Sequence, residues 1–429
     1  MGRAKINNIK LTISIIANRI TELSSLSGGE RIFIEFARRW AQRGYLINIF
    51  TSKEGSSICS RYNLDKLDNI HLTIWSGCKN NRHEFSLWFS VLIYIYRTVE
   101  GSLKTMKMFM FKSTNDSKSI IFSSSPFWPD LIPSFIMKKR MKKARLIVGF
   151  YLFAPNPFKG GYRTWYKNGF QFSTFKDWSR TLALWINHLP VYWLVKKYAD
   201  VVFVTNEMDR HRFITRKLVS DRVIAVQGGV DTKTPMLVRE PENKEYDAVF
   251  IGRFHPQKGV LELIDIWKHI CEIRKGTKLA MIGNGPLEKD AEQKINDFGL
   301  EKNIDLYGFK DGVEKIKIFK SSRVVLHPAV YDSGGMAACE AMACGLPGVS
   351  FDLPALKTYY PKGMIKTPIG DLKKFAENII NLLEDEELYE KTRKDAIDWA
   401  QNWDWDKRAN EILSKILNTF GWAEGGKAN

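Results

Sequence analysis

Residues Tyr331 to Pro347 read Y-D-S-G-G-M-A-A-C-E-A-M-A-C-G-L-P. Two carboxylates, Asp332 and Glu340, are separated in this stretch by seven residues, and a glycine pair lies between them. We expect a loop that runs into a helix starting near Met336, whose backbone N–H groups and dipole would attract a phosphate or a developing anion. Glu340 would then lie one turn inside the helix, so that both acids face one cavity from different heights.

The loop itself carries Ser333, Gly334 and Gly335, and glycine allows a ligand to approach the backbone closely. These features predict a sugar-nucleotide site. The alternative is an ordinary amphipathic helix that is closed by Gly345 as a C-cap and by Pro347, with its acids on a solvated face.

Length and charge bound the possible folds and partners. A chain of 429 residues with 44% hydrophobic content predicts two globular domains, each with its own core. Residues 1–240 carry 38 Lys and Arg against 17 Asp and Glu, whereas residues 241–429 carry 27 against 30. The positive first half predicts an anionic partner: a lipid headgroup surface, a phosphorylated substrate or nucleic acid.

Two segments of the first half could contact such a partner. The densest basic run extends from Lys138 to Arg145, and its alternative interpretation is a solvated helix end. The segment Tyr151 to Trp193 is rich in Trp, Phe and Tyr among basic residues. Such residues can enter a membrane interface or line an acceptor groove, and equally they can form plain core.

The cysteines and the apolar runs bear on the cellular compartment of the protein and on whether it spans a membrane. The five cysteines form no CxxC or Cys/His cluster, which predicts reduced thiols of an intracellular protein without structural zinc. The apolar run Leu11 to Ala17 fits a buried first strand better than a signal peptide. The longest apolar stretch, Phe85 to Tyr96, is about half of what a bilayer span requires, so we expect no transmembrane helix.

Apolar runs alternate with helical patterns along the whole chain, as is typical of parallel βαβ construction. The expected strands of the first half are Ile9–Ala17, Leu46–Phe50, Ile70–Trp75, Ile120–Phe122, Leu146–Phe150, Val201–Val204 and Arg222–Val226. Those of the second half are Ala248–Gly252, Lys278–Ile282, Ile304–Tyr307, Val324–His327 and Gly348–Phe351. Expected helices are Ser27–Gln42, Val260–Lys275, Glu288–Phe298, Val313–Lys320 and Ala337–Cys344. The polar stretch Asp231–Tyr246 resembles an interdomain linker. The pattern predicts an α/β fold of two Rossmann-like, doubly wound domains facing across a cleft.

Three further features favour phosphate and sugar binding. Gly28 and Gly29 lie between the first strand and its helix, where a glycine turn brings N–H groups toward an anion. Arg253 and Lys258, in the stretch G-R-F-H-P-Q-K-G, follow the first strand of the second half and could together hold a diphosphate. G-N-G-P-L at 283–287 and Y-G-F-K at 307–310 follow successive strands, and the latter could edge a nucleobase. Each feature alone is equally consistent with a simple turn or with surface charge.

The combination and order of these motifs resemble the retaining glycosyltransferases of family 4, which have the GT-B architecture. The resemblance covers most of the chain, from G-G-E at 28–30 to N-W-D-W-D at 402–406, which is similar to the start of the family's final helix. It implies an N-terminal acceptor domain over residues 1–235 that is rejoined by a C-terminal helix over about 406–429. A donor domain for a nucleotide sugar would occupy residues 245–400.

The resemblance also implies roles for individual residues. Arg253 and Lys258 would bind the donor diphosphate, Glu340 would bond the ribose hydroxyls, and Asp332 would contact the transferred sugar. Further donor contacts would come from Gly28, Gly29, Gly252, Gly283, Gly308, Phe309, Lys310, Ser333, Gly334, Gly335 and Met336. No metal and no cofactor are implied, and the substrate would be a UDP-sugar or a GDP-sugar.

Three departures from the family pattern stand out. Asp332 replaces a glutamate, which shortens its reach toward the sugar by one methylene. Gln227-Gly228-Gly229-Val230-Asp231 stands in place of P-N-G-V-D. Gly149-Phe150-Tyr151 occupies the place where the family has an active-site histidine.

The expected function is a metal-independent, retaining hexosyl transfer to a lipid-linked or glycan acceptor, in synthesis of cell-surface glycans. The basic first domain suggests a cytoplasmic enzyme resting peripherally on an anionic membrane face. Asp404-Trp405-Asp406 imitates a D-x-D metal motif, but its position in the tail favours a structural role. One alternative is a sugar-nucleotide epimerase on the same scaffold. A second is a phosphorylase, for which no cofactor-lysine motif is found. A third is a basic nucleic-acid-binding protein. No nucleic-acid-binding signature supports the last of these, so we expect no nucleic-acid partner.

Overall fold

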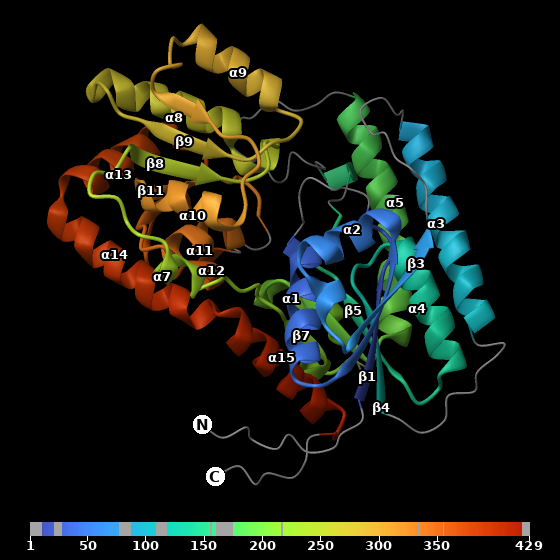
Figure 1. Cartoon of the computed structure of the whole chain (residues 1–429). Coiled ribbons are helices and arrows are strands. Elements are labelled where there is room, and N and C mark those ends of the chain that lie inside the picture. The colour runs from blue at the N-terminus through green and yellow to red at the C-terminus, as the bar shows by residue number, and fades with distance from the viewer. Residues whose placement is uncertain are drawn as a thin grey trace, which may run out of the picture. The chain divides into compact units, whose positions relative to one another are not determined.

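The structure is a computed structural model that describes residues 11–20, 28–76, 87–108, 118–154, 157–159, 175–215, 218–332, 335–354 and 356–422. The chain divides into two compact units, and Figure 1 shows its elements in chain order. The first unit comprises the residues up to Ala154, Leu182–Val226 and the residues from Ala409 on. The second comprises Pro155–Thr181 and Gln227–Arg408. Each unit contains one parallel sheet.

The sheet of the first unit has seven strands in the order β3-β2-β1-β4-β5-β6-β7. Its strands are β1 Leu11–Ala17, β2 Leu46–Ser52, β3 Ile70–Ser76, β4 Lys118–Ser123, β5 Arg145–Gly149, β6 Val201–Val204 and β7 Val223–Ala225. In register, Ile13 of β1 lies between Ile47 of β2 and Ile120 of β4. All three side chains are buried, as expected for a parallel sheet that is covered on both faces.

The helices of this unit follow the strands in βαβ order. They are α1 Gly28–Gln42, α2 Lys53–Arg61, α3 Leu87–Met108, α4 Trp128–Arg140, α5 Phe175–Tyr198 and α6 Glu207–Phe213, of which α5 belongs to this unit from Leu182 onward. The last helix of the chain, α15 (Trp405–Thr419), contributes to this unit from Ala409 onward. There the indole Nε1 of Trp40 donates to the carbonyl of Ala409 at 3.0 Å.

The sheet of the second unit has six strands in the order β10-β9-β8-β11-β12-β13. They are β8 Tyr246–Ile251, β9 Leu279–Ile282, β10 Ile304–Leu306, β11 Ser322–His327, β12 Gly348–Phe351 and β13 Met364–Thr367. The order reverses between β8 and β11, because the chain moves outward from β8 to β10 and then outward on the other side from β11 to β13. Such a switch point leaves a crevice at the carboxyl ends of the strands, where open α/β sheets bind ligands.

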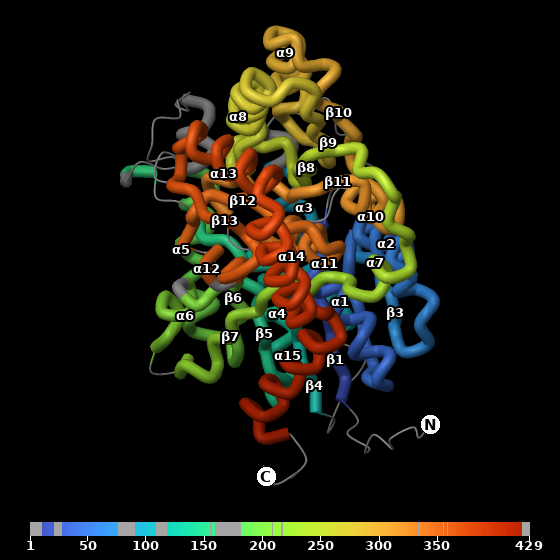
Figure 2. The backbone as a smooth tube through the Cα atoms, turned by 90° about the vertical axis from the view of Figure 1, so that its left-hand side faces the viewer, coloured from blue at the N-terminus to red at the C-terminus, as the bar shows by residue number. Residues whose placement is uncertain are grey.

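Helices cover both faces of this sheet. One buried cluster joins it to α8 (Val260–Ile273) and α13 (Leu372–Glu384), which lie on the same side in Figure 2. A second cluster joins the other face to α10 (Gly312–Lys320) and α11 (Met336–Ala343). The remaining helices of the unit are α7 Thr234–Leu237, α9 Glu288–Asp297, α12 Leu356–Tyr359 and α14 Glu386–Ala400.

The sequence pattern located most of these elements. All twelve expected strands are present, and their ends agree within two residues. One strand, β13, was not expected. The stretch Asp231–Tyr246, expected to be a linker, lies inside the second unit, which begins after Val226. There Asp231 accepts hydrogen bonds from the N–H groups of Lys233 and Thr234, both at 3.0 Å, and so holds the start of α7.

Two further expectations concern membrane-spanning helices and the state of the cysteines. None of the described helices is both long and apolar enough to cross a membrane. The cysteines that the structure describes, Cys59, Cys271, Cys339 and Cys344, carry free thiols.

Candidate functional site

The loops that follow β8, β9, β10 and β11 are tied together by backbone hydrogen bonds. Phe254 N donates to Asn284 O at 2.8 Å, and Gly283 N donates to Gly308 O at 2.9 Å. Val330 N donates to Gln257 O at 3.0 Å. The loops containing G-R-F-H-P-Q-K-G, G-N-G-P-L and Y-G-F-K therefore form one connected rim at the carboxyl edge of the sheet, around the switch point.

Several glycines of this rim are required by close packing of the backbone. A Cβ on Gly283 would lie 1.9 Å from the carbonyl oxygen of Gly252, and one on Gly285 would lie 2.5 Å from that of Phe254. Gly259 has φ +66° and would place a Cβ 2.0 Å from the carbonyl oxygen of Pro328. These positions shape the rim whether or not a ligand is bound, so the glycine pattern alone is no evidence of phosphate binding.

Lys258 and Asp332 meet at the centre of the rim. The Lys258 ammonium lies 2.5 Å from Oδ2 of Asp332, and Nε2 of His327 lies 3.2 Å from the same oxygen. Both Asp332 and His327 are buried. Burial alone would raise the pKa of the Asp332 carboxyl, but the charge of Lys258 and the contact with His327 outweigh it and hold the pKa far below its ordinary value. Asp332 is thus a carboxylate, and its charge is matched by Lys258.

Arg253 is the second cation of the rim. Its side chain is exposed and forms no ion pair with any of the residues that the structure describes. His255, between the two cations, has its pKa lowered from 6.5 to about 4, first by burial and then by the positive charges of Arg253 and Lys258. With His255 neutral, Arg253 and Lys258 are the charges of the loop after β8, and two neighbouring cations favour an anionic ligand.

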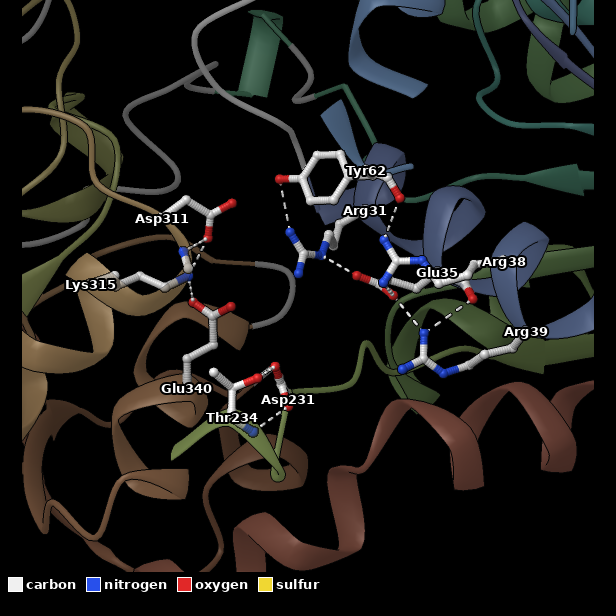
Figure 3. A network of polar contacts seen from close by, with 11 residues as sticks. Arg31, Glu35, Arg38, Arg39, Tyr62, Asp231, Thr234, Asp311, Lys315 and Glu340 are labelled. Carbon is white, nitrogen blue, oxygen red and sulfur yellow. Dashed lines mark hydrogen bonds and ion pairs between the residues drawn. The ribbon is translucent and has the colours of Figure 1, made fainter. Parts of the chain in front are cut away.

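Glu340 is held by a lysine that the sequence did not single out. Its Oε2 accepts from Lys315 Nζ at 2.9 Å, and the same ammonium donates to Oδ1 of Asp311 at 2.9 Å (Figure 3). Lys315 is buried, which would lower its pKa, but the carboxylates of Glu340 and Asp311 raise that pKa well above its ordinary value. Lys315 therefore stays charged and fixes the Glu340 carboxylate, which remains partly exposed.

The helix expected near Met336 begins at that residue. Gly335, its N-cap, has no room for a side chain, because a Cβ would lie 2.3 Å from the hydroxyl oxygen of Tyr360. The side chain of Met336 packs on Gly228, where a Cβ would lie 1.7 Å from the Met336 sulfur. Ser333 and Gly334, predicted to contact the donor, lie outside the described residues.

The proposed nucleobase contacts are available at the surface. Phe309 is exposed, and Gly308 has φ +63° with open space where a side chain would stand. Lys310 forms an ion pair with Glu314 at 3.5 Å.

The unexpected strand β13 places one more cation at the same edge of the sheet. Nζ of Lys366 donates to Oγ of Ser350 at 3.0 Å and lies over the ring of Tyr360. Burial lowers its pKa to about 8. Nothing in the sequence distinguishes Lys315 or Lys366 from the many other lysines of the chain. His327 ends a correctly predicted strand, and its position at a carboxyl end is the signal that could have identified it.

In the first unit, Gly28 and Gly29 open α1 as expected. A Cβ on Gly29 would lie 2.5 Å from the ring of Tyr151, and one on Gly149 would lie 2.6 Å from the same ring. Tyr151 is the residue near which the family's histidine was expected. Its hydroxyl is buried and has no hydrogen-bond partner among the described residues, and burial raises its pKa. Gly29 thus makes room for this ring.

A cluster of arginines lies further along α1 (Figure 3). The buried carboxylate of Glu35 forms ion pairs with Arg31, Arg38 and Arg39 at distances of 2.8, 3.4 and 2.5 Å. The Arg31 guanidinium also donates to the hydroxyl of Tyr62 at 2.9 Å. The three arginines share one carboxylate, so this segment of the helix has a net positive charge.

The D-x-D sequence in the tail has structural contacts, as its position predicted. Oδ1 of Asp404 accepts from the N–H of Asp406 at 2.8 Å, and Oδ2 accepts from the hydroxyl of Thr232 at 2.9 Å. Asp406 forms an ion pair with Lys233 at 2.7 Å. Within the described part of the chain, no group of three or more His, Cys, Asp or Glu side chains is arranged to hold a metal ion.

Comparison with known proteins places this site in a family. Residues 237–399 match the family model described as glycosyl transferases group 1. Among curated relatives, the phosphatidyl-myo-inositol mannosyltransferase of Mycobacterium leprae is 28% identical over 169 residues, covering 38% of this chain and 44% of that protein. The capsular polysaccharide biosynthesis glycosyltransferase CapM of Staphylococcus aureus is 24% identical over 257 residues, covering 55% and 67%.

Solved structures agree on the fold. The structure of HepE from Anabaena in complex with UDP-glucose has a TM-score of 0.66 at 15% identity, covering 95% of this chain and 99% of that one. This likeness shows the GT-B fold. The matched part of the chain spans 27%, 44% and 65% of the length of three curated relatives. Residues 237–399, which match the model of the glycosyl transferases group 1 family, contain Arg253, Lys258, Asp332 and Glu340.

Proposed function

We propose that the protein is a retaining glycosyltransferase, which moves a hexose from a UDP-sugar or GDP-sugar to a lipid-linked or glycan acceptor in synthesis of cell-surface glycans. The observation that carries the proposal is the rim at the switch point of a group 1 sheet. It combines the cations Arg253 and Lys258 with the carboxylates Asp332 and Glu340, each of which is fixed by a lysine.

The contacts of these residues support separate roles. Arg253 is exposed, and its planar guanidinium suits a diphosphate. Lys258 can exchange its contact with Asp332 for a phosphate oxygen, or hold both. The Glu340 carboxylate, fixed by Lys315, can accept hydrogen bonds from the two ribose hydroxyls. Asp332 would meet hydroxyls of the transferred sugar.

The reaction that we propose needs no protein nucleophile and no metal. The bond between the anomeric carbon and the diphosphate oxygen breaks first, and an oxocarbenium-like sugar remains. The acceptor hydroxyl then bonds to the anomeric carbon on the face that the diphosphate leaves, and its proton passes to the departing phosphate oxygen. Arg253, Lys258 and the N-terminal N–H groups of α11 stabilise the charge on the leaving diphosphate.

The acceptor class rests on charge and on the relatives. The first half of the chain carries 38 Lys and Arg against 17 Asp and Glu, which favours an anionic membrane surface. The names of two relatives refer to phosphatidyl-myo-inositol and to capsular polysaccharide. We propose a peripheral position on the cytoplasmic membrane face, with a lipid-linked or glycan acceptor. The sequence contains no nucleic-acid-binding motif, so we propose lipid rather than nucleic acid as the anionic partner.

The test is product analysis. Purified protein is incubated with UDP- and GDP-hexoses and with lipid-linked glycan acceptors, with and without EDTA, and the new linkage is examined by ¹H NMR. The proposal predicts an α-linked product from an α-configured donor, with EDTA having no effect. A β-linked product would refute retention, and loss of activity that Mg²⁺ or Mn²⁺ restores would refute metal independence. Release of an altered free sugar without acceptor would instead indicate an epimerase.

A further inference from the structure

Helix α3 (Leu87–Met108) has its polar and apolar faces reversed relative to an ordinary surface helix. Its buried face includes Arg97, Thr98, Gly101 and Thr105. Its solvent face carries large apolar side chains that are 40–62% exposed: Val91, Leu92, Ile95, Tyr96, Val99, Leu103, Met106 and Met108. Six of these residues, from Leu92 to Met106, recur at spacings of three and four and so form one continuous stripe.

The polar contacts of the inner face fix this orientation. The Arg97 guanidinium donates to the Ile20 carbonyl at 2.6 Å and forms an ion pair with Glu54 at 2.8 Å. Its backbone carbonyl accepts from Nδ2 of Asn18 at 3.0 Å. Rotating the helix to bury the apolar stripe would leave the buried Glu54 carboxylate without this cation, which is strongly unfavourable. The stripe therefore faces outward as part of the fold.

Helix α5 (Phe175–Tyr198) repeats the pattern beside α3. Ile186, Leu189 and Trp193 recur at spacings of three and four on its solvent face and are 48–57% exposed. The two helices are linked by a hydrogen bond of 3.3 Å from the hydroxyl of Tyr94 to Oδ1 of Asn187. Figure 1 shows them side by side. We call the two exposed stripes together the α3–α5 surface; the stripe of α3 alone already exceeds what isolated surface residues would produce.

Cations lie at the ends of this surface. Lys107 is in the last turn of α3, and Lys196 and Lys197 are in the last turn of α5. The ammonium of Lys197 lies 4.7 Å from the centre of the Trp193 ring, and that of Lys196 lies 4.3 Å from the centre of the Tyr192 ring. Amphipathic aromatic rings beside lysines are typical of side chains at a membrane interface, where the ring lies among acyl chains and the ammonium meets headgroups.

Charge decides between a membrane and a protein partner. Membrane binding by an amphipathic helix grows with the apolar area that it buries and with its electrostatic attraction to anionic lipids. This chain has both, because the excess of Lys and Arg lies in the half of the sequence that contains α3 and α5. Since neither helix is apolar enough to span a bilayer, the surface would lie in the membrane plane.

We propose that the α3–α5 surface is the membrane-binding surface of the protein, which inserts its apolar stripes into the interface of an anionic lipid bilayer. The proposal rests on the membrane position in the proposed function, but not on sugar transfer. Vesicle binding is therefore measured without donor or acceptor, so that failure of this proposal and failure of the transferase proposal can be told apart.

The experiment is flotation of the full chain with vesicles. One set contains phosphatidylglycerol and phosphatidylcholine, and the other contains phosphatidylcholine alone. The test variant is Val99→Gln with Leu103→Gln, which changes two solvent-facing positions. The matched control is Met236→Gln with Leu237→Gln, two residues of the second unit that are 76% and 84% exposed. Circular dichroism and thermal unfolding check that each variant is folded.

Wild type and the Met236/Leu237 variant are expected to float with anionic vesicles at low salt, and less with neutral vesicles. The Val99/Leu103 variant is expected to bind at least about tenfold more weakly, because two exposed apolar side chains that would insert into the lipid interface are lost. Equal binding of the Val99/Leu103 variant would overturn the proposal. So would a wild type that stays unbound, or a dimer seen by light scattering that only this variant dissociates, since a second copy would then cover the surface.

Discussion

Oδ2 of Asp332 contacts two side chains at once: the ammonium of Lys258 at 2.5 Å and Nε2 of His327 at 3.2 Å. Through this one oxygen the loop after β8 is joined to the end of β11 across the switch point of the sheet. Lys258, which would bind the donor phosphate, is thereby held in place by Asp332, which would contact the transferred sugar. The contact couples the two halves of the proposed donor site.

Lys258→Met should destabilise the protein. It leaves the Asp332 carboxylate buried without its cation, and removing one partner of a buried pair costs about 3 kcal/mol. Urea unfolding at pH 7 measures the change. The double variant Lys258→Met with Asp332→Asn should recover part of the loss, since no buried charge then remains. If the single and double variants unfold alike, the loss does not come from an unpaired Asp332 charge.

The same pair predicts a pH dependence. Because the folded pKa of Asp332 is depressed, the pair stabilises the fold above the unfolded pKa of about 3.9. That contribution is lost as pH falls toward the folded pKa. The stability difference between wild type and Lys258→Met should therefore shrink below about pH 4. A constant difference between pH 7 and pH 3 would contradict the assignment.

His255 should report occupation of the phosphate site. Its pKa is lowered to about 4 by burial and by Arg253 and Lys258, so an anion bound to these cations should raise it. Titration of the His255 imidazole by NMR, with and without UDP or GDP, measures the shift. Arg253→Gln should raise the pKa in the free protein and weaken the response to nucleotide. An unchanged His255 pKa in the presence of saturating nucleotide would place the diphosphate elsewhere.

Lys315 should act as a positioning residue for Glu340. Lys315→Met removes a charged hydrogen bond, and we expect the KM for donor to rise on the order of tenfold while kcat changes less. Asp311→Asn, which leaves the contact between Lys315 and Glu340 in place, should raise KM by no more than about threefold. Lys315→Arg should restore part of the affinity. Equal KM values for the Lys315→Met and Asp311→Asn variants would contradict a positioning role of Lys315 toward Glu340.

Gly259 and Gly299 offer a matched pair for the backbone of the rim. Both have φ +66°, but a Cβ on Gly259 would lie 2.0 Å from Pro328 O, whereas Gly299 has open space. Gly299→Ala should cost about 1 kcal/mol, the price of the left-handed conformation alone. Gly259→Ala should cost about 3 kcal/mol or more, because the backbone must also move. Thermal unfolding compares them, and equal melting temperatures would contradict the close packing at Gly259.

The sequence predicted the fold well because long apolar runs alternate regularly with helical patterns. It missed β13, which is four residues long, includes Lys366 and follows Pro361 and Gly363 at a short distance, so it lacks the continuous apolar signal of the other strands. With that strand it missed Lys366. It also left α2 to α7 and α12 to α14 unassigned. In α3, apolar residues on the exposed face of a helix that buries Arg97 reverse the usual pattern.

The site could be predicted only in part. The positions of Asp332, Glu340, Arg253 and Lys258 relative to strand ends followed from the motifs. The pairing of Lys258 with Asp332, and of Lys315 with Glu340, could not, because each joins segments that are far apart in the sequence. Some motif glycines, such as Gly283, were assigned to the ligand on sequence grounds, while the structure shows that packing of the backbone already requires them.

The most direct test of the donor site is calorimetric titration of the protein with a panel of UDP-, GDP- and ADP-sugars. Wild type, Arg253→Ala, Glu340→Ala and the control Arg393→Ala, a surface cation of the same unit, are compared. We predict saturable binding of one nucleotide sugar to wild type and to the control, lost in both site variants. Binding that survives in Arg253→Ala and Glu340→Ala, or no binding of any nucleotide sugar to wild type, would contradict a donor site at the switch point of the second sheet.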